Sequence, residues 1–109
     1  MTFSILARCP DTRVLGIATA TRSFAVGARV PFVRTRRGVV AIMSRADARL
    51  GDHALGLLDR GHKAAMVVDM LVRNDPHAEH RQLAVIDDDG DAAARTGAAA
   101  SSPLAPARP

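Results

Sequence analysis

The sequence predicts a single domain of the α+β class, with antiparallel strands and a helical hairpin. Two β-rich runs, 2–8 and 13–20, flank the turn-forming letters CPDT, a pattern typical of an antiparallel strand pair. Two later segments, 48–60 and 63–73, repeat apolar residues at helical spacing. The chain has 109 residues, 48% of them hydrophobic, which is enough for one packed core.

The first strand pair also predicts how the domain is layered. Placing Arg8 opposite Arg13 sets Thr2 near Thr19, with residues 21–23 just beyond the same end. Both faces of this hairpin are apolar, with Phe3, Ile5 and Ala7 on one face and Leu6, Leu15 and Ile17 on the other. A strand pair that is apolar on both faces is normally covered on both sides. We therefore expect a layered fold with this hairpin in its interior.

The middle of the chain predicts a central strand followed by two helices. Segment 24–35 is interrupted by Gly27 and Pro31 and should be irregular or short-stranded. The continuous apolar run GVVAIMS (38–44) is typical of a central strand. The helices are predicted from the apolar spacing of Leu50, Ala54, Leu57 and Leu58, and of Met66, Val67, Met70 and Leu71.

Capping residues set the ends of this αα-hairpin. Ser44 or Asp47 is suited to cap the first helix, and Gly61 is placed to end it. Asn74-Asp75-Pro76 should stop the second helix.

The last part of the domain predicts a second hairpin and a tail. RQLAVID (81–87) is strand-like, DDDG (87–90) is turn-forming, and DAAART (91–96) is a suitable partner strand. After Gly97 the sequence is rich in Ala, Pro and Ser and has no apolar period. We expect a domain over residues 1–97 and a disordered tail over 98–109.

Composition argues against several classes of function. The net charge is +4, but the arginines are scattered, and Tyr and Trp are absent, so base stacking would depend on three Phe residues. Nucleic acid is therefore not an expected partner. No apolar run is long enough to span a bilayer and no secretory signal is visible. With Cys9 as the only cysteine, these features favour a cytoplasmic protein.

Metal and cofactor sites are not predicted. Residues 87–91 contain four Asp residues around Gly90, but no distal Glu follows to complete a calcium loop, so a hairpin turn explains them better. The histidines and Cys9 lack the spacing that brings ligands together on one element. No glycine-rich phosphate loop occurs, and we expect no cofactor.

Thr2 is the residue with the clearest possible chemistry. Its small side chain permits removal of Met1, which would place a hydroxyl and a free α-amine on one residue. The amine can accept the hydroxyl proton, so the two groups form a nucleophile and its base. An unperturbed α-amine has a pKa of roughly 7.7–8.0, which leaves a neutral fraction near neutral pH. Thr is also a common strand residue, and a purely structural role explains it as well.

Several stretches together resemble the bacterial domain-of-unknown-function family 1028. They are the opening MTFSILAR, the Gly-Ile-Ala strand, Thr-Arg-Ser and FAVG, followed by the helix pair, the Asp-Pro stop, RQLAVID and Thr-Gly. The resemblance runs from Met1 to about Gly97. It implies the N-terminal-nucleophile hydrolase-like fold, in which two packed sheets are covered by helices in an αββα sandwich.

The resemblance also implies an activity and two site residues. It points to an amide-bond hydrolase acting on an unidentified small molecule or peptide. Thr2 matches the nucleophile position. Arg22 matches the arginine of the family's Ser-Arg motif, where a cation would lower the pKa of the amine or hold an anionic group.

The chain departs from the family in two places. Ile42, Met43 and Asp47 stand where family members usually carry a Thr-Gln pair and an Asn. Members also continue for another hundred or so residues, so we expect a C-terminally truncated or divergent member with a partial sandwich and impaired activity. Uncovered apolar surface would then favour a homo-oligomer. The alternative function is a non-catalytic interaction or structural module that retains half the fold.

Overall fold

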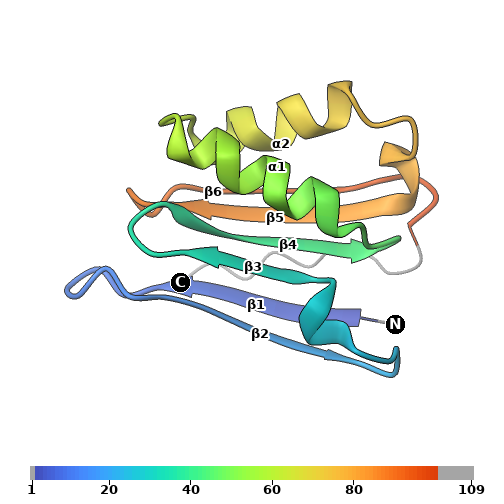
Figure 1. Ribbon diagram of the computed structural model, residues 1–109, viewed down its shortest axis with the longest axis horizontal. Coiled ribbons are helices and arrows are strands. Elements are labelled where there is room, and N and C mark those ends of the chain that lie inside the picture. The colour runs from blue at the N-terminus through green and yellow to red at the C-terminus, as the bar shows by residue number, and fades with distance from the viewer. Residues whose placement is uncertain (1, 101–109) are drawn as a thin grey trace.

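The computed structural model describes residues 2–100 as three stacked layers (Figure 1). Two helices form one outer layer, a four-stranded antiparallel sheet forms the middle layer, and a two-stranded antiparallel hairpin forms the third. The strands are β1 (Thr2–Arg8), β2 (Leu15–Thr21), β3 (Pro31–Arg34), β4 (Gly38–Ser44), β5 (Arg81–Asp87) and β6 (Ala92–Thr96). The helices are α1 (Ala48–Asp59) and α2 (Ala64–Arg73), with short 3-10 turns η1 (Val26–Ala28) and η2 (Ala78–His80). The α+β class is thus confirmed.

The middle sheet has the order β3-β4-β5-β6 and holds the centre of the molecule. β4 is buried over its first six residues, as expected for the continuous apolar run in this segment. It pairs with β5 from Gly38↔Asp87 to Ser44↔Arg81, and β5 pairs with β6 through the turn that follows Asp87. The predicted second hairpin is therefore confirmed. β3 supplies the short strand expected near the irregular segment 24–35.

Both helices pack on one face of this sheet and form the larger core. This cluster includes Val40, Ile42, Leu57, Leu71 and Leu83, all of which are fully buried. The predicted helix bounds are within one residue of the observed ones. Of the two capping candidates for α1, Asp47 makes the cap: its Oδ1 accepts a hydrogen bond of 3.0 Å from the Arg49 N–H.

One detail of the helix prediction is confirmed by the structure and another differs from it. Gly61 adopts a φ of +87° after α1, a conformation that favours glycine, so its predicted role at the helix end is confirmed. Met66, which was predicted to lie in the core, is 46% exposed. Val68 is buried instead, because α2 turns the stripe of Ala64, Val67, Val68 and Leu71 toward the sheet.

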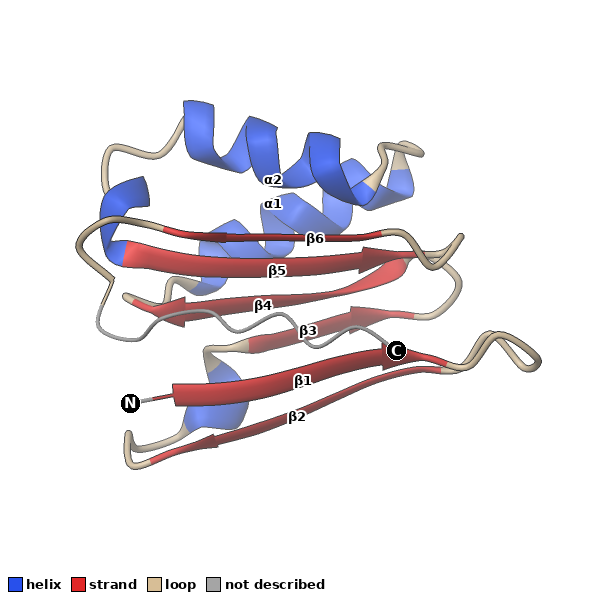
Figure 2. Cartoon of the chain, turned by 180° about the vertical axis from the view of Figure 1, so that it is seen from behind, coloured by secondary structure: helices blue, strands red, loops and turns tan. Residues whose placement is uncertain are grey.

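The β1–β2 hairpin covers the opposite face of the middle sheet. β1 lies against β4 and β5, whereas β2 lies against β3 and β4 (Figure 2). A second, smaller core of Val30, Ala41 and Met43 fills the space between the sheets, and Leu6 and Ile17 of the hairpin pack against it. The hairpin therefore contributes one apolar face to the interior.

The other face of the hairpin is exposed, so the expectation that both faces are covered is wrong. Phe3 is 61% exposed and Ile5 is 55% exposed, and Ala7, Gly16, Ala18 and Ala20 on the same face are also exposed. The alternation of half-buried and exposed residues along both strands places all of them on the outer side. Within residues 2–100 nothing covers this face, so the hairpin is the outermost layer.

The chain after β6 stays close to η2 as far as the structure describes it. The N–H groups of Gly97 and Ala99 donate to the carbonyl oxygens of Arg81 and Glu79, and the Ala98 N–H donates to the Glu79 carboxylate. The first residues of the expected tail thus have hydrogen-bond partners. Residues 101–109 of that tail, and Met1, lie outside the described residues. Within residues 2–100, neither helix is long and apolar enough to cross a membrane.

Candidate functional site

Hydroxyl side chains gather on the inner face of the hairpin at the end where β1 begins. Thr2 Oγ1 lies 3.1 Å from Thr21 Oγ1, and Ser4 Oγ lies 3.0 Å from Thr19 Oγ1. All four residues are half-buried. Each pair is a directly opposed cross-strand pair, and the alternation of the strands puts both pairs on the side that faces the middle sheet. Thr2 therefore lies at the end of the hairpin, with its half-buried side chain on the side that faces the middle sheet.

The observed register differs by two residues from the predicted one. Thr2 pairs with Thr21 rather than lying near Thr19, and Arg8 pairs with Leu15 rather than Arg13. The reason is the turn: Cys9 N–H donates to the Val14 carbonyl oxygen, and Arg13 has a φ of +62°. Arg13 and Val14 thus belong to the turn, although both suit a strand by sequence. A shift of two preserves the inward and outward faces.

The corrected register brings Arg22 closer to Thr2 in the hairpin. Arg22 directly follows Thr21, the partner of Thr2, and the Ser23 N–H donates to Thr21 Oγ1 over 3.2 Å. Arg22 is exposed, and it forms no ion pair among residues 2–100. The structure therefore places the two predicted site residues at one end of the hairpin, with an unneutralised positive charge beside the threonine pair.

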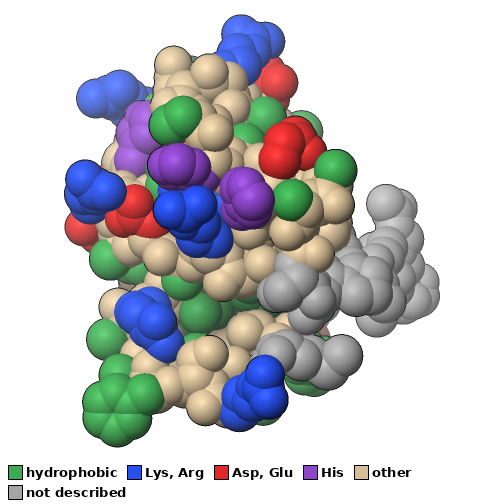
Figure 3. All heavy atoms as spheres, turned by 90° about the vertical axis from the view of Figure 1, so that its right-hand side faces the viewer, with side chains coloured by type: hydrophobic (Ala, Val, Ile, Leu, Met, Phe, Trp, Pro, Cys, Tyr) green, Lys and Arg blue, Asp and Glu red, His purple; other side chains and the backbone are tan. Residues whose placement is uncertain are grey.

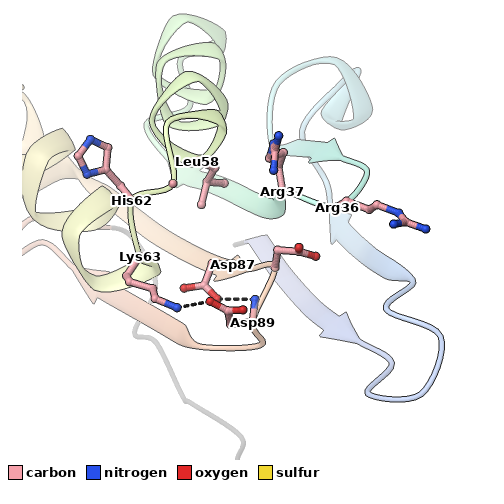
Figure 4. A pocket seen from close by; sticks show the side chains of 9 residues that line it. Arg36, Arg37, Leu58, His62, Lys63, Asp87 and Asp89 are labelled. Atoms are coloured by element: carbon pink, nitrogen blue, oxygen red, sulfur yellow. Dashed lines mark hydrogen bonds and ion pairs between the residues drawn. The ribbon is translucent and has the colours of Figure 1, made fainter.

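Two surface pockets lie at the opposite end of the molecule from Thr2, around the strand turns. One, of about 180 Å³, is lined by Arg36, Arg37, Lys63 and the Asp87–Asp89 turn (Figure 4). The other, of about 290 Å³, lies between the β1–β2 turn and the β3–β4 turn. Neither pocket includes Thr2 or Arg22, and sequence patterns gave no indication of either.

Ion pairs within the chain neutralise most of the charge in the first pocket. Lys63 Nζ pairs with Asp89 and lies 3.7 Å from Asp91, and Arg13 pairs with Asp88. These contacts raise the pKa of Lys63 and lower the pKa of Asp89, chiefly through the hydrogen bond between them. The pocket is therefore a cluster of paired charges that joins α2 to the β5–β6 turn.

The contacts of Asp87 give the acidic run 87–91 a structural role. Its buried carboxylate accepts hydrogen bonds from the N–H groups of Ala64 at 2.9 Å, Asp89 at 3.0 Å and Asp91 at 3.1 Å. One side chain thus caps the start of α2 and shapes the turn of the second hairpin. Within the described part of the chain, no group of His, Cys, Asp and Glu has the geometry of a metal site.

The face at the Thr2 end carries dispersed charges. Figure 3 views the molecule from this end and shows histidines grouped over the helical half, with Lys and Arg side chains spread among them and across the hairpin half. The basic side chains visible there do not merge into one continuous patch.

Both the sequence and the fold of this chain are similar to those of known proteins. The layers and pairings define a mixed α+β protein built on antiparallel sheets. The chain belongs to DUF1028, a family of unknown function whose model matches residues 2–108. The resemblance stated from the sequence is thus confirmed. No curated protein matches the chain.

A solved structure of the same family has a similar fold. It is protein SPO2555 from Silicibacter pomeroyi, with 36% sequence identity and a TM-score of 0.84. The match covers 89% of this chain but only 45% of the Silicibacter chain. The matched part of the present chain therefore corresponds to less than half of this relative's length.

Proposed function

We propose that this chain supplies the nucleophile of an N-terminal-nucleophile amide-bond hydrolase, and that Thr2 is that residue. The observation that carries the proposal is the position of Thr2: it is the first residue of β1, half-buried, with its hydroxyl 3.1 Å from that of Thr21 on the inner side of the hairpin. A nucleophile at this position is held by a strand, and its half-buried side chain keeps part of its surface exposed.

The chemistry requires Met1 to be removed. The free α-amine of Thr2 then accepts the proton from Oγ1 while Oγ1 attacks the carbonyl carbon of an amide. The C–N bond breaks, the departing amine takes up the proton, and an ester to Thr2 remains. Water, activated by the same amine, hydrolyses this ester and restores the hydroxyl. The positive charge of Arg22 would lower the pKa of the α-amine, which keeps more of it in the neutral, basic form.

The layer structure supports the same proposal. The helices, the four-stranded sheet and the two-stranded sheet would be three of the four layers of an αββα sandwich. The fourth layer would lie on the exposed face of the hairpin. We therefore propose a partial sandwich that acts on a small molecule or a peptide, with no layer over the outer face of the hairpin within residues 2–100. Activity of the chain alone would then be impaired.

A non-catalytic interaction module is the second candidate function. It is favoured by the exposed apolar face of the hairpin. An interaction module needs neither removal of Met1 nor the hydroxyl of Thr2. The two candidates therefore differ in how they respond to substitution of Thr2.

Variants of Thr2 test the catalytic proposal. We expect an electrophilic amide probe to label wild type and Thr2→Ser, and to leave Thr2→Val unlabelled, because valine keeps the branched shape of threonine but has no hydroxyl. Thr19→Val is the matched control, since it removes a hydroxyl of the same inner face and should still be labelled. Circular dichroism verifies that all four proteins are folded. Equal labelling of Thr2→Val and wild type would reject Thr2 as the nucleophile.

A further inference from the structure

The larger of the two surface pockets lies between turns that belong to different layers of the fold. It has a volume of about 290 Å³. Residues 12–15 of the β1–β2 turn and the start of β2 form one wall, and Val33, Thr35 and Arg36 of β3 and the β3–β4 turn form the other. We call this cavity the turn pocket. Within residues 2–100, no carboxylate is among the side chains that line it, whereas two arginines are.

The two arginines bring one guanidinium from each wall. Arg13 pairs with Asp88 through Nη2, which leaves its other N–H groups for a ligand. Arg36 is exposed, and within the described residues its side chain forms no ion pair and no hydrogen bond. Figure 4 shows the Arg36 guanidinium turned away from Asp87 and Asp89 of the smaller pocket. The turn pocket therefore keeps an uncompensated positive charge.

The backbone of both arginines is left-handed, with φ of +62° at Arg13 and +59° at Arg36. This conformation is uncommon for side chains other than those of Asn and Asp, and glycine adopts it without strain. Among residues 2–100, only four non-glycine residues have a positive φ, and two of them are the arginines of this one pocket. Strained backbone positions cluster at ligand-binding sites. Arginine at both turns is thus explained by what its side chain binds, because glycine would fit either turn better.

Two valines give the turn pocket an apolar side. Val14 is 65% exposed and Val33 is 46% exposed, and they come from opposite walls. Thr12 and Thr35 add one hydroxyl to each wall. A ligand that carries both a negative charge and an apolar group would contact the arginines and the valines together. A bare inorganic anion would leave the valines exposed to water.

We propose that the turn pocket binds a small organic anion, namely a phosphate monoester or a carboxylate that carries a short apolar group. A guanidinium recognises the oxygens of both groups through paired N–H···O bonds. The volume of the pocket is near the lower end of the range of ~300–1,000 Å³ for small-molecule sites, which favours a small ligand. The seven residues of β1 separate this pocket from Thr2. The site is therefore independent of catalysis by Thr2, and either proposal can fail alone.

Titration of ¹⁵N-labelled protein followed by NMR tests the ligand class. The probes are phenyl phosphate and benzoate, with inorganic phosphate, acetate and phenol for comparison. We expect at least one of the two aromatic anions to shift the amide signals of residues 12–15 and 33–36, and to leave those near Thr2 unchanged. Inorganic phosphate or acetate should bind at least about tenfold more weakly than its aromatic counterpart, and phenol should cause no shift.

The response to the two aromatic anions identifies the preferred anionic group. A shift with phenyl phosphate alone supports a phosphate monoester, and a shift with benzoate alone supports a carboxylate. The proposal would be overturned if neither anion shifted these signals, or if the inorganic phosphate or acetate bound as tightly as its aromatic counterpart.

Replacing Arg36 by asparagine tests whether this arginine holds the ligand. Arg36→Asn should weaken binding of the aromatic anion by at least about tenfold, because a charge-assisted contact is lost. Its melting temperature should not fall, since asparagine tolerates a left-handed backbone. Arg37→Asn is the matched control: Arg37 is the next residue and equally charged, but it lines the smaller pocket and lies 3.6 Å from Asp59. This control should bind the anion as wild type does.

Three results with these variants would overturn the proposal. Unchanged affinity of Arg36→Asn would remove Arg36 from the site. Equal losses in Arg36→Asn and Arg37→Asn would reduce the effect to net charge. A marked fall in the melting temperature of Arg36→Asn would give the arginine a structural role in the turn.

Discussion

Replacing Arg81 by methionine is expected to lower the free energy of unfolding by about 3–5 kcal/mol, because it leaves a buried carboxylate without its partner. The side chains of Arg81 and Asp75 are only 5% and 4% exposed. Arg81 Nε donates to Asp75 Oδ2 over 2.5 Å, Nη2 donates to Asp75 Oδ1 over 3.3 Å, and Nη1 donates to the Arg45 carbonyl oxygen. One guanidinium thus joins the end of α2, the start of β5 and the residue after β4.

Chemical denaturation measures this loss, and a surface pair provides the control. Arg73 forms an exposed i,i+4 pair with Asp69 at 2.7 Å, and Arg73→Met should cost no more than about 0.5 kcal/mol. Adding Asp75→Asn to Arg81→Met should recover part of the lost stability, since the unpaired negative charge is then removed. If Arg81→Met cost no more than Arg73→Met, the buried pair would not contribute as proposed.

The same pair makes the stability of the protein depend on pH in the acidic range. Burial raises the pKa of Asp75. Hydrogen bonds from Arg81 and from the His77 N–H, together with the charge of Arg81, lower this pKa by a larger amount, so the net shift is downward. The stabilisation is therefore present above the unfolded-state pKa of about 3.9 and is lost as pH falls through the lower folded-state value. The stability difference between wild type and Arg81→Met should accordingly shrink below about pH 4.

Gly97→Ala is expected to be the second large loss, of about 3 kcal/mol, because a methyl group has no space at this position. A Cβ on Gly97 would overlap the backbone carbonyl groups of Glu79 and Ala78. These are backbone atoms of η2, so they cannot move aside as a side chain could. The Gly97 N–H also donates to the Arg81 carbonyl oxygen over 2.9 Å, and a shift of the chain would weaken that bond.

Gly56→Ala is the matched control for the glycine prediction. Gly56 lies in α1, and a Cβ there would meet nothing within 4 Å. Alanine favours the helix over glycine, so this variant should gain about 0.5–1 kcal/mol. In thermal unfolding, Gly56→Ala should then melt at a higher temperature than wild type, and Gly97→Ala at a lower temperature. A Gly97→Ala protein as stable as wild type would contradict the close approach of η2 and the end of β6.

Local sequence patterns predicted the elements of this fold because those patterns are set by local physics. The helical spacing within 48–60 and 63–73 and the apolar run at 38–44 each reflect burial of one face or one strand. The hairpin register was missed because Arg13 adopts a left-handed conformation that its residue type does not indicate. The Arg81–Asp75 pair was also missed, since two charged residues in sequence give no sign of being buried together.

The candidate site was predictable only in part. Thr2 and Arg22 came from the chemistry of an N-terminal threonine and from a family resemblance, and the structure places both at one end of the hairpin. The pairing of Thr2 with Thr21 depends on the strand register and could not be predicted from the sequence. The outer face of the β1–β2 hairpin was expected to be covered because its residues are apolar. Apolarity indicates that a surface suits burial, but it does not say whether the covering layer belongs to the same chain.

Peptide mass spectrometry of the probe-treated protein tests the central claim most directly. The account predicts an N-terminal peptide that begins at Thr2, without Met1, and that carries the probe on Thr2. Retained Met1 would block the amine that serves as the base, and a label on another residue with Thr2 unmodified would place the reactivity elsewhere. Either result would contradict Thr2 as the nucleophile and leave it as the first residue of a structural strand.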